Sequence, residues 1–157
     1  MDVRKATEQD IEAAIGLAER TRRQYQKYQP AFWRKPTDSV ARTRALFTGM
    51  VAEPGAYFLV AVEGRQQLGF LIATKFPAPP VQAPVGDIYL IDDFCVAEPH
   101  LWLTIGEALL SHATTLLHEH GATQIVVVCG DRDLPKAEML RRSDLTIASS
   151  WWTKPLG

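Results

Sequence analysis

Near the N-terminus, apolar residues recur at the spacing of an α-helix. The recurring positions are Ile11, Ala14, Ile15 and Ala18. They predict a helix from about residue 8 to residue 28, which Thr7 caps and Asp10 supports from the capping-box position. A second helix is predicted from its N-cap, Thr37, to the turn at residues 53–55.

Elsewhere in the chain, runs of β-branched and aromatic residues predict strands. These runs cover residues 3–6, 56–62, 68–76, 87–97, 123–129 and 145–154. The run TQIVVVC at 123–129 is almost entirely apolar, which predicts a central strand buried on both faces. Four prolines make residues 77–86 a loop.

Two further helices are predicted in the second half of the chain, at residues 103–121 and after Asp133, which can cap the last one. The resulting order places a hairpin meander of strands before a β–α–β unit. Such an order predicts an α/β (α+β) fold, in which a mixed sheet carries helices on both faces. A length of 157 residues suits one domain spanning residues 1–157.

The composition is that of an ordinary soluble protein, with 46% hydrophobic and 22% charged residues. A formal net charge of −1 provides no basic surface for nucleic acid or for an anionic membrane. The N-terminal segment lacks the apolar core of a signal peptide and no run is long enough to span a bilayer, so a cytoplasmic location is expected. Cys95 and Cys129 lack metal-ligand spacing and are expected as reduced thiols, and no metal site is expected.

The segment EPHLWLTIGEALL, residues 98–110, follows the predicted strand at 87–97 and begins a helix. A helix N-terminus presents unpaired backbone N–H groups, which can bind a phosphate. Phosphate turns usually contain several glycines, because the backbone must approach the anion closely. This turn contains Gly106 alone, with Trp102 and Thr104 at two of the crowded positions.

The stretch VAEPHLWLTIGEALL, residues 96–110, resembles the cofactor loop of the GCN5-related N-acetyltransferases, the GNAT superfamily. A typical loop of that family reads V-x-P-x-x-R-G-x-G-I-G-x-x-L-L, and the shared positions are Val96, Ile105, Gly106, Leu109 and Leu110. Leu101 stands where the family has Arg or Gln, and Trp102 and Thr104 stand where it has glycines. Leu140 stands where many members have a tyrosine that protonates the leaving thiolate.

The resemblance implies the GNAT fold over nearly the whole chain, with a mostly antiparallel sheet of six to seven strands. It also implies acetyl-CoA as co-substrate, with the strand before the turn binding the pantetheine arm and the turn binding the pyrophosphate. The implied cofactor-binding residues are Phe94, Cys95, Val96, Leu101, Trp102, Leu103, Thr104, Ile105, Gly106 and Asp133. The side chain of Trp102 can either block the groove or point outward and cover the adenine.

Asp92 and Asp93 are adjacent on a predicted strand, so their side chains are expected on opposite faces of the sheet. A carboxylate in the cleft can accept the proton of an amine or bind a cationic substrate, and Asp93 is the preferred catalytic candidate. A purely structural bond to an arginine or to a loop N–H group is equally open.

An aromatic group lies where the first two helices of the family shape the acceptor pocket. Its members are Tyr25, Tyr28, Phe32 and Trp33, which are expected to bind the acceptor or to pack on the core. Asp131 follows the strand at 123–129 and is a second candidate for the acceptor site. Four cations of the first helix are expected on a solvated face: Arg20, Arg22, Arg23 and Lys27.

Two functions therefore remain open. The first is an acetyl-CoA-dependent N-acetyltransferase that transfers an acetyl group directly to an amine of a small molecule or a peptide. The second is a catalytically inactive GNAT-fold protein that has lost normal acetyl-CoA binding and serves in binding or regulation. Neither function calls for a nucleic-acid or membrane partner, and Trp151 or Trp152 can form the contact of a homodimer.

Overall fold

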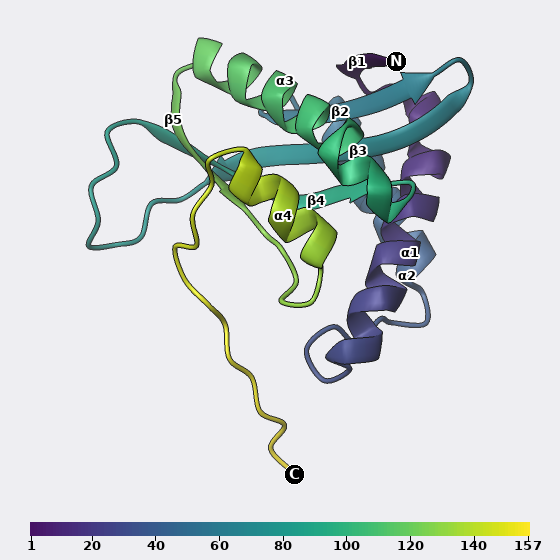
Figure 1. The fold of residues 1–157 in the computed structure, drawn as a ribbon, viewed down its shortest axis with the longest axis vertical. Coiled ribbons are helices and arrows are strands. Elements are labelled where there is room, and N and C mark those ends of the chain that lie inside the picture. Colours follow the sequence, from purple (N-terminus) through teal and green to yellow (C-terminus); the bar gives the residue numbers. More distant parts are fainter.

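The computed structural model describes residues 1–157, which form one sheet of five strands and four α-helices that pack on it (Figure 1). The strands are β1 (Asp2–Lys5), β2 (Ala56–Glu63), β3 (Gln66–Phe76), β4 (Asp87–Val96) and β5 (Ala122–Val127). The α-helices are α1 (Ile11–Tyr28), α2 (Ser39–Ala52), α3 (Ile105–Glu119) and α4 (Leu134–Arg142). Two short 3₁₀ helices, η1 (Glu8–Asp10) and η2 (Pro99–Leu103), precede α1 and α3. None of the helices combines the length and the hydrophobicity that a membrane crossing requires.

The sheet is mixed and mostly antiparallel, in the order β1-β2-β3-β4-β5. The first four strands pair antiparallel with their neighbours, and β4 pairs parallel with β5. The predicted architecture is thus confirmed, but the sheet has five strands rather than six to seven. β5 is the last strand in this order, so it is an edge strand, and it is only partly buried. The prediction that this segment forms a central strand buried on both faces was therefore wrong.

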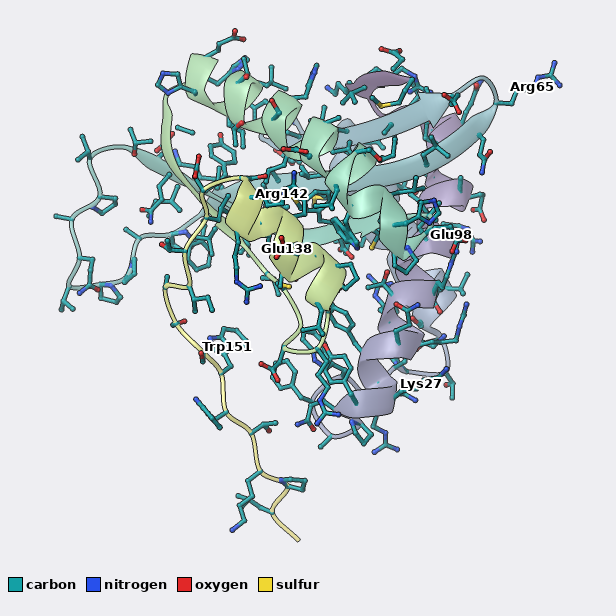
Figure 2. All side chains as sticks on the ribbon, viewed as in Figure 1. Lys27, Arg65, Glu98, Glu138, Arg142 and Trp151 are labelled. Carbon is teal, nitrogen blue, oxygen red and sulfur yellow. The ribbon has the colours of Figure 1, made fainter.

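The strand predicted at residues 145–154 is absent. This segment has no regular structure, follows α4 through Asp144 at φ 63°, and runs away from the sheet towards the C-terminus (Figure 1). Trp151 is 84% and Trp152 94% exposed, and Trp151 lies on the extended tail outside the helices and strands (Figure 2). Strand propensity alone does not form a strand, because a strand needs a partner for its backbone hydrogen bonds.

Helices cover both faces of the sheet, as predicted. On one face, α1 and α2 enclose a buried cluster in which the ring of Phe47 meets those of Phe58 and Phe70 at 5.4 Å in each case. On the other face, α3 and α4 pack on a second cluster that includes Phe94 and Leu109 (Figure 1). The sheet therefore separates two apolar layers.

A β-bulge interrupts β4 in its middle. Leu71 of β3 lies opposite Phe94, whereas Ala73 lies opposite Ile91, so both Asp92 and Asp93 face a single residue of β3. The parallel ladder with β5 ends at the same level, where the Val128 N–H donates to the Ile91 carbonyl at 3.0 Å. Beyond this point β4 continues for five residues along β3 without β5 on its other side. The two strands part here, and the candidate site lies at the parting.

The start of α1 is held by a charged cap. The Asp10 carboxylate accepts two hydrogen bonds from the Arg4 guanidinium, each of 2.8 Å, and one from the Thr7 N–H at 2.7 Å. The bonds from Arg4 are the main reason why the pKa of Asp10 falls to about 2, against the opposing effect of burial. The folded state therefore favours the ionised carboxylate over the protonated form.

We expect Asp10→Asn to lower the free energy of unfolding at pH 7 by about 2 kcal/mol. A lowered folded-state pKa stabilises the protein above the ordinary pKa of 3.8, and this contribution disappears as the pH falls towards 2. Urea unfolding from pH 7 down to pH 2 should thus show the two proteins converging in acid. Asp131→Asn, at an exposed carboxylate, is the control and should change little; an Asp10→Asn deficit that persists at pH 2 would contradict the assignment.

Candidate functional site

Two hollows meet where β4 parts from β5. The first, here called the η2 cavity, has a volume of about 280 Å³ and lies between α1, the end of β4, η2 and the start of α4. The second, here called the α1–α2 cleft, has a volume of about 400 Å³ and lies between α1, α2, residues 32–36 and the bulge of β4. Thr21 and Tyr25 of α1 line both. The two hollows are therefore neighbours that share part of one wall.

The two carboxylates of the bulge line the α1–α2 cleft. Regular alternation along a strand predicts opposite faces for Asp92 and Asp93, but the bulge breaks the alternation and both border the same cleft. Asp92 is exposed, whereas the side chain of Asp93 is 24% exposed and accepts a hydrogen bond from Arg22 at 3.1 Å. Burial and the charge of Asp92 raise the pKa of Asp93, while Arg22 and Lys136 oppose the rise.

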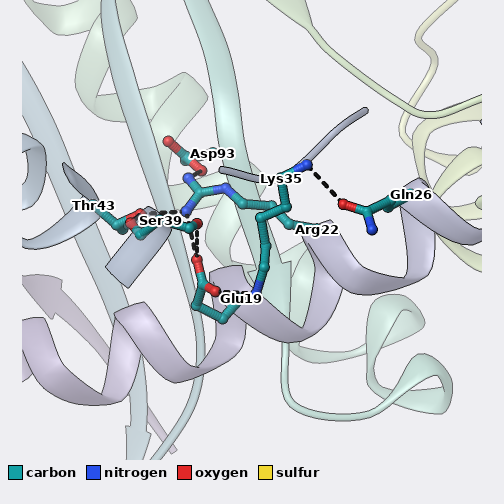
Figure 3. A network of polar contacts seen from close by, with 7 residues as sticks. All are labelled: Glu19, Arg22, Gln26, Lys35, Ser39, Thr43 and Asp93. Atoms are coloured by element: carbon teal, nitrogen blue, oxygen red, sulfur yellow. Dashed lines mark hydrogen bonds and ion pairs between the residues drawn. The ribbon is translucent and has the colours of Figure 1, made fainter. Parts of the chain in front are cut away.

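A network of charged and hydroxyl groups ties the walls of the α1–α2 cleft together (Figure 3). The Glu19 carboxylate of α1 accepts hydrogen bonds from Lys35 at 2.5 Å, from Ser39 of α2 and from Arg22. Arg22 also donates to the Thr43 hydroxyl of α2 at 2.5 Å, besides its bond to β4. Burial opposes ionisation of Glu19, but Lys35, Ser39 and Arg22 outweigh it, so the pKa of this carboxyl is lowered.

The cations of α1 differ from the expectation of a wholly solvated face. Arg23 and Lys27 are exposed as expected, but Arg20 and Arg22 are half-buried. Arg20 donates to the Ala97 carbonyl at 2.5 Å, beside the end of β4. The sequence offered one signal for Arg22: it lies three residues after Glu19 and so shares its helical face.

Neither the cysteines nor Tyr25 provides an activated nucleophile at this site. Cys95 and Cys129 are both free, and burial raises the pKa of each thiol to about 11, so both are protonated at neutral pH. The Tyr25 hydroxyl donates to Asp133 at 2.7 Å and accepts from the Gly130 N–H at 3.1 Å, and burial raises the pKa of this phenol above its usual value of 10. Leu140 is buried in the core, so no acid occupies that position.

The turn between β4 and α3 is closed by a tryptophan. Trp102 of η2 is 5% exposed, and a Cβ atom added to Gly106 would lie 2.5 Å from its Cε3 atom. Its ring also packs on that of Phe94 with centroids 4.9 Å apart. Trp102 therefore points inward and fills the space in front of Gly106. The Thr104 hydroxyl is directed to the Leu101 carbonyl at 3.3 Å.

The remaining residues of the turn and of β4 divide between core and surface. Phe94, Cys95 and Ile105 are buried, Val96 and Leu101 are half-buried, and Leu103 is exposed. Asp133 begins α4, where its carboxylate accepts from the Lys136 N–H at 3.4 Å as well as from Tyr25, and it lines the η2 cavity. Val96 and Trp102 line that cavity too, so part of the predicted cofactor set is brought together there.

The predicted acceptor residues are divided between the two hollows. Phe32 and Trp33 line the α1–α2 cleft, Tyr28 lines the η2 cavity and Tyr25 lines both. Their rings are in contact in the order Tyr28, Tyr25, Trp33, Phe32, and Phe32 meets Trp151 of the tail at 6.0 Å. Asp131 is exposed and lines neither hollow.

The sequence did not indicate Lys136 as a functional candidate. Lys136 of α4 is 2% exposed, and its ammonium donates to the Phe94 carbonyl at 3.2 Å. The same Nζ atom lies 5.2 Å from the ring centroid of Phe94 and 5.4 Å from that of Trp102. The available signal was helical spacing, because Lys136 lies three and four residues before the buried Met139 and Leu140.

Comparison with known proteins finds relatives by structure alone, since no family model and no curated protein matches the sequence. A variant of the BH1408 protein from Bacillus halodurans superposes with a TM-score of 0.83 over 99% of each chain, at 20% identity. A GCN5-related N-acetyltransferase from Ralstonia eutropha gives 0.71 at 19% identity, over 99% of this chain and 97% of that one. This chain has the GNAT fold.

A third structural neighbour was solved with a ligand. A predicted acetyltransferase from Clostridium acetobutylicum, solved with acetyl-CoA, matches with a TM-score of 0.74 at 15% identity, over 98% of this chain and 95% of that one. At such identities the likeness extends to the fold, and the chemistry has to be argued from the residues of this chain.

We expect Arg22→Met to raise the pKa of Asp93 further, because it removes a positive charge and a hydrogen bond that both favour the carboxylate. An NMR titration that follows the Asp93 carboxyl carbon measures the change. Arg23→Met is the matched control, since it removes the same charge from an exposed neighbour with no ion pair. Equal Asp93 titrations in the two variants would show that the contact with Arg22 has no electrostatic effect.

Proposed function

We propose that this GNAT-fold protein is an acetyl-CoA-dependent N-acetyltransferase that passes an acetyl group directly to an amine of a small molecule or a peptide. The observation that carries the proposal is the meeting of two hollows at the parting of β4 and β5. Transfer between two substrates needs such an arrangement, because the reacting atoms must be held within about 3–3.5 Å of each other. The η2 cavity would receive the donor, and the α1–α2 cleft the acceptor.

The η2 cavity fits part of the donor. Acetyl-CoA, when bound, supplies an acyl group activated as a thioester. The cavity runs along the backbone from Val96 to Pro99 and past Asp133, which suits an extended pantetheine arm. The turn does not offer a glycine-lined cradle for the pyrophosphate, because the ring of Trp102 fills the space in front of Gly106. We therefore assign the pantetheine arm to this cavity. The phosphates would lie on the solvent side of Trp102 and not against Gly106.

Asp93 is the proposed base for the amine. An amine attacks a thioester only as the neutral form, so a proton acceptor beside it assists the reaction. Burial raises the pKa of Asp93 and thus makes its carboxylate a stronger base than an exposed aspartate, while Arg22 holds its orientation. Asp92, at the exposed side of the bulge, would attract a cationic amine to the cleft. The protonated thiols favour direct transfer over an acyl-cysteine intermediate.

A second candidate function rests on a specific observation. Trp102 and Lys136 are both almost fully buried beside Phe94, on the side of β4 that β5 leaves open. With these side chains in place, the pantetheine arm has less room than in a glycine-rich GNAT loop. The protein would then be a catalytically inactive binding or regulatory module with the GNAT fold.

Titration calorimetry with acetyl-CoA separates the two functions. The transferase should bind it with a Kd between about 1 μM and 1 mM, and should gain thermal stability by mass action. Acetyl transfer to a panel of amines, followed by release of free thiol, would then be lowered by Asp93→Asn roughly 10²- to 10⁴-fold in kcat. Asp144→Asn, on the exposed turn after α4, is the matched control.

Failure of a folded protein to bind acetyl-CoA at millimolar concentration would exclude the transferase and leave the binding module. Binding without any loss of kcat in Asp93→Asn would retain the transferase but remove the proposed base.

We also propose that the protein forms a homodimer through the exposed tryptophans of the tail. Trp151 and Trp152 expose large aromatic surfaces, and tryptophan is enriched at protein interfaces. Light scattering should give twice the chain mass for the natural sequence, and the mass of one chain for Trp151→Ser combined with Trp152→Ser. A natural protein that stays monomeric at high concentration would contradict the dimer.

A further inference from the structure

The ammonium of Lys136 lies at the floor of the α1–α2 cleft with most of its hydrogen-bonding capacity unused. It lines this cleft, is 2% exposed and has one protein partner, the Phe94 carbonyl at 3.2 Å. An ammonium carries three N–H donors, so two are left without a protein acceptor. The rings of Phe94 and Trp102 lie over it and offset part of the cost of burying the charge.

No carboxylate of the protein forms a direct ion pair with this ammonium, although Asp93 attracts it at longer range. Lys136 forms no ion pair within 4.0 Å, and the Asp93 carboxylate in the same cleft is bound to Arg22. A buried charge without a counter-charge is costly, and proteins normally pair it or use it to hold a ligand. The arrangement therefore leaves a place for one negative charge next to Lys136.

The rest of the cleft also favours an anion. The chain as a whole has a net charge of −1, yet five cationic side chains and two carboxylates line this cleft. Three of the cations already have carboxylate partners, namely Arg22, Lys35 and Arg42. Arg34 is exposed, so Lys136 is the buried cation of the cleft that has no direct carboxylate partner.

The walls of the cleft are aromatic and aliphatic. Phe32, Trp33, Tyr25 and Leu46 line it, and the volume of about 400 Å³ lies within the usual range of small-molecule sites. A ligand that fits both features has an apolar body and a single anionic group. A phosphate monoester carries close to two negative charges and three acceptor oxygens, which one ammonium would leave largely unmatched, so a carboxylate fits better.

We propose that the α1–α2 cleft is a binding site for a small carboxylate with an apolar body, whose carboxylate pairs with Lys136 and whose body packs on Phe32 and Trp33. The carboxylate site stands without the proposed function. Its second consequence rests on that function: the amine acceptor is then an amino carboxylate, with its carboxylate at Lys136 and its amine near Asp93.

The test uses three matched probes that contain no amine, with no acetyl-CoA added: 3-phenylpropionate, its neutral amide and phenyl phosphate. Calorimetry on the full chain should show 3-phenylpropionate binding at least ten times more tightly than the amide. Lys136→Met removes the charge and keeps an unbranched side chain that is one atom shorter, and should weaken 3-phenylpropionate binding at least tenfold while leaving the amide unchanged. Lys154→Met, at an exposed cation of the tail, is the control and should bind as the natural protein does.

Lys136→Met removes a buried charge but leaves the Phe94 carbonyl without its hydrogen-bond donor, which lowers stability, so the fold of the variant has to be verified. Circular dichroism checks this, and protection of the natural protein by 3-phenylpropionate in thermal unfolding gives a readout that needs no variant. Three outcomes would overturn the proposal. They are equal affinity for 3-phenylpropionate and its amide, undiminished binding of 3-phenylpropionate by Lys136→Met, and no binding of 3-phenylpropionate at millimolar concentration. If phenyl phosphate binds more tightly than 3-phenylpropionate, the proposal of a carboxylate site is wrong and the site prefers a phosphate.

These outcomes are separate from those of the acetyl-CoA titration. A protein that binds acetyl-CoA but not the carboxylate remains a transferase with a different acceptor. A protein that binds the carboxylate but not acetyl-CoA has the anion site without the transferase.

Discussion

The parting of β4 from β5 is the constraint on which the rest of the site depends. The bulge at Asp92 and Asp93 bends β4, and its ladder with β5 ends at Ile91. Half of β4 then has no strand on one side, although buried backbone groups need hydrogen-bond partners. The Phe94 carbonyl finds one in Lys136, and this is how an ammonium comes to lie in the interior.

Three residues of α1 arrange both hollows around that parting. Glu19, Arg22 and Tyr25 follow one another at three-residue intervals, so each side chain is a neighbour of the next on the helix surface. Glu19 and Arg22 join α1 to α2 and to the bulge, while Tyr25 reaches across to Asp133 at the start of α4. The position of one helix thus orients the Asp93 carboxylate and forms the wall that the two hollows share.

The sequence left open whether the side chain of Trp102 points into the groove or outward, and the structure shows that it packs inward. Sequence alone could not decide this, because the packing depends on three residues that lie apart in the chain. The absence of a side chain at Gly106 leaves room for the indole, Phe94 offers an aromatic neighbour, and Lys136 supplies a cation over the ring. None of these contacts follows from local spacing. The same holds for the cleft that Asp92 and Asp93 share, since a bulge has no clear signature in a run of apolar and acidic residues.

The sequence by itself determined the four α-helices, the five strands and the mixed sheet with helices on both faces, but it also predicted a sixth strand that does not form. Helical and strand periodicity located every helix and the five strands, since those patterns arise from the geometry of one segment against one core. Tertiary structure alone decided which strand has a partner and which charge has a counter-charge. Residues 145–154 have strand propensity without a neighbour, the valine-rich β5 lies at an edge, and Lys136 is buried beside Phe94. Those features depend on groups that meet only when distant segments pack together.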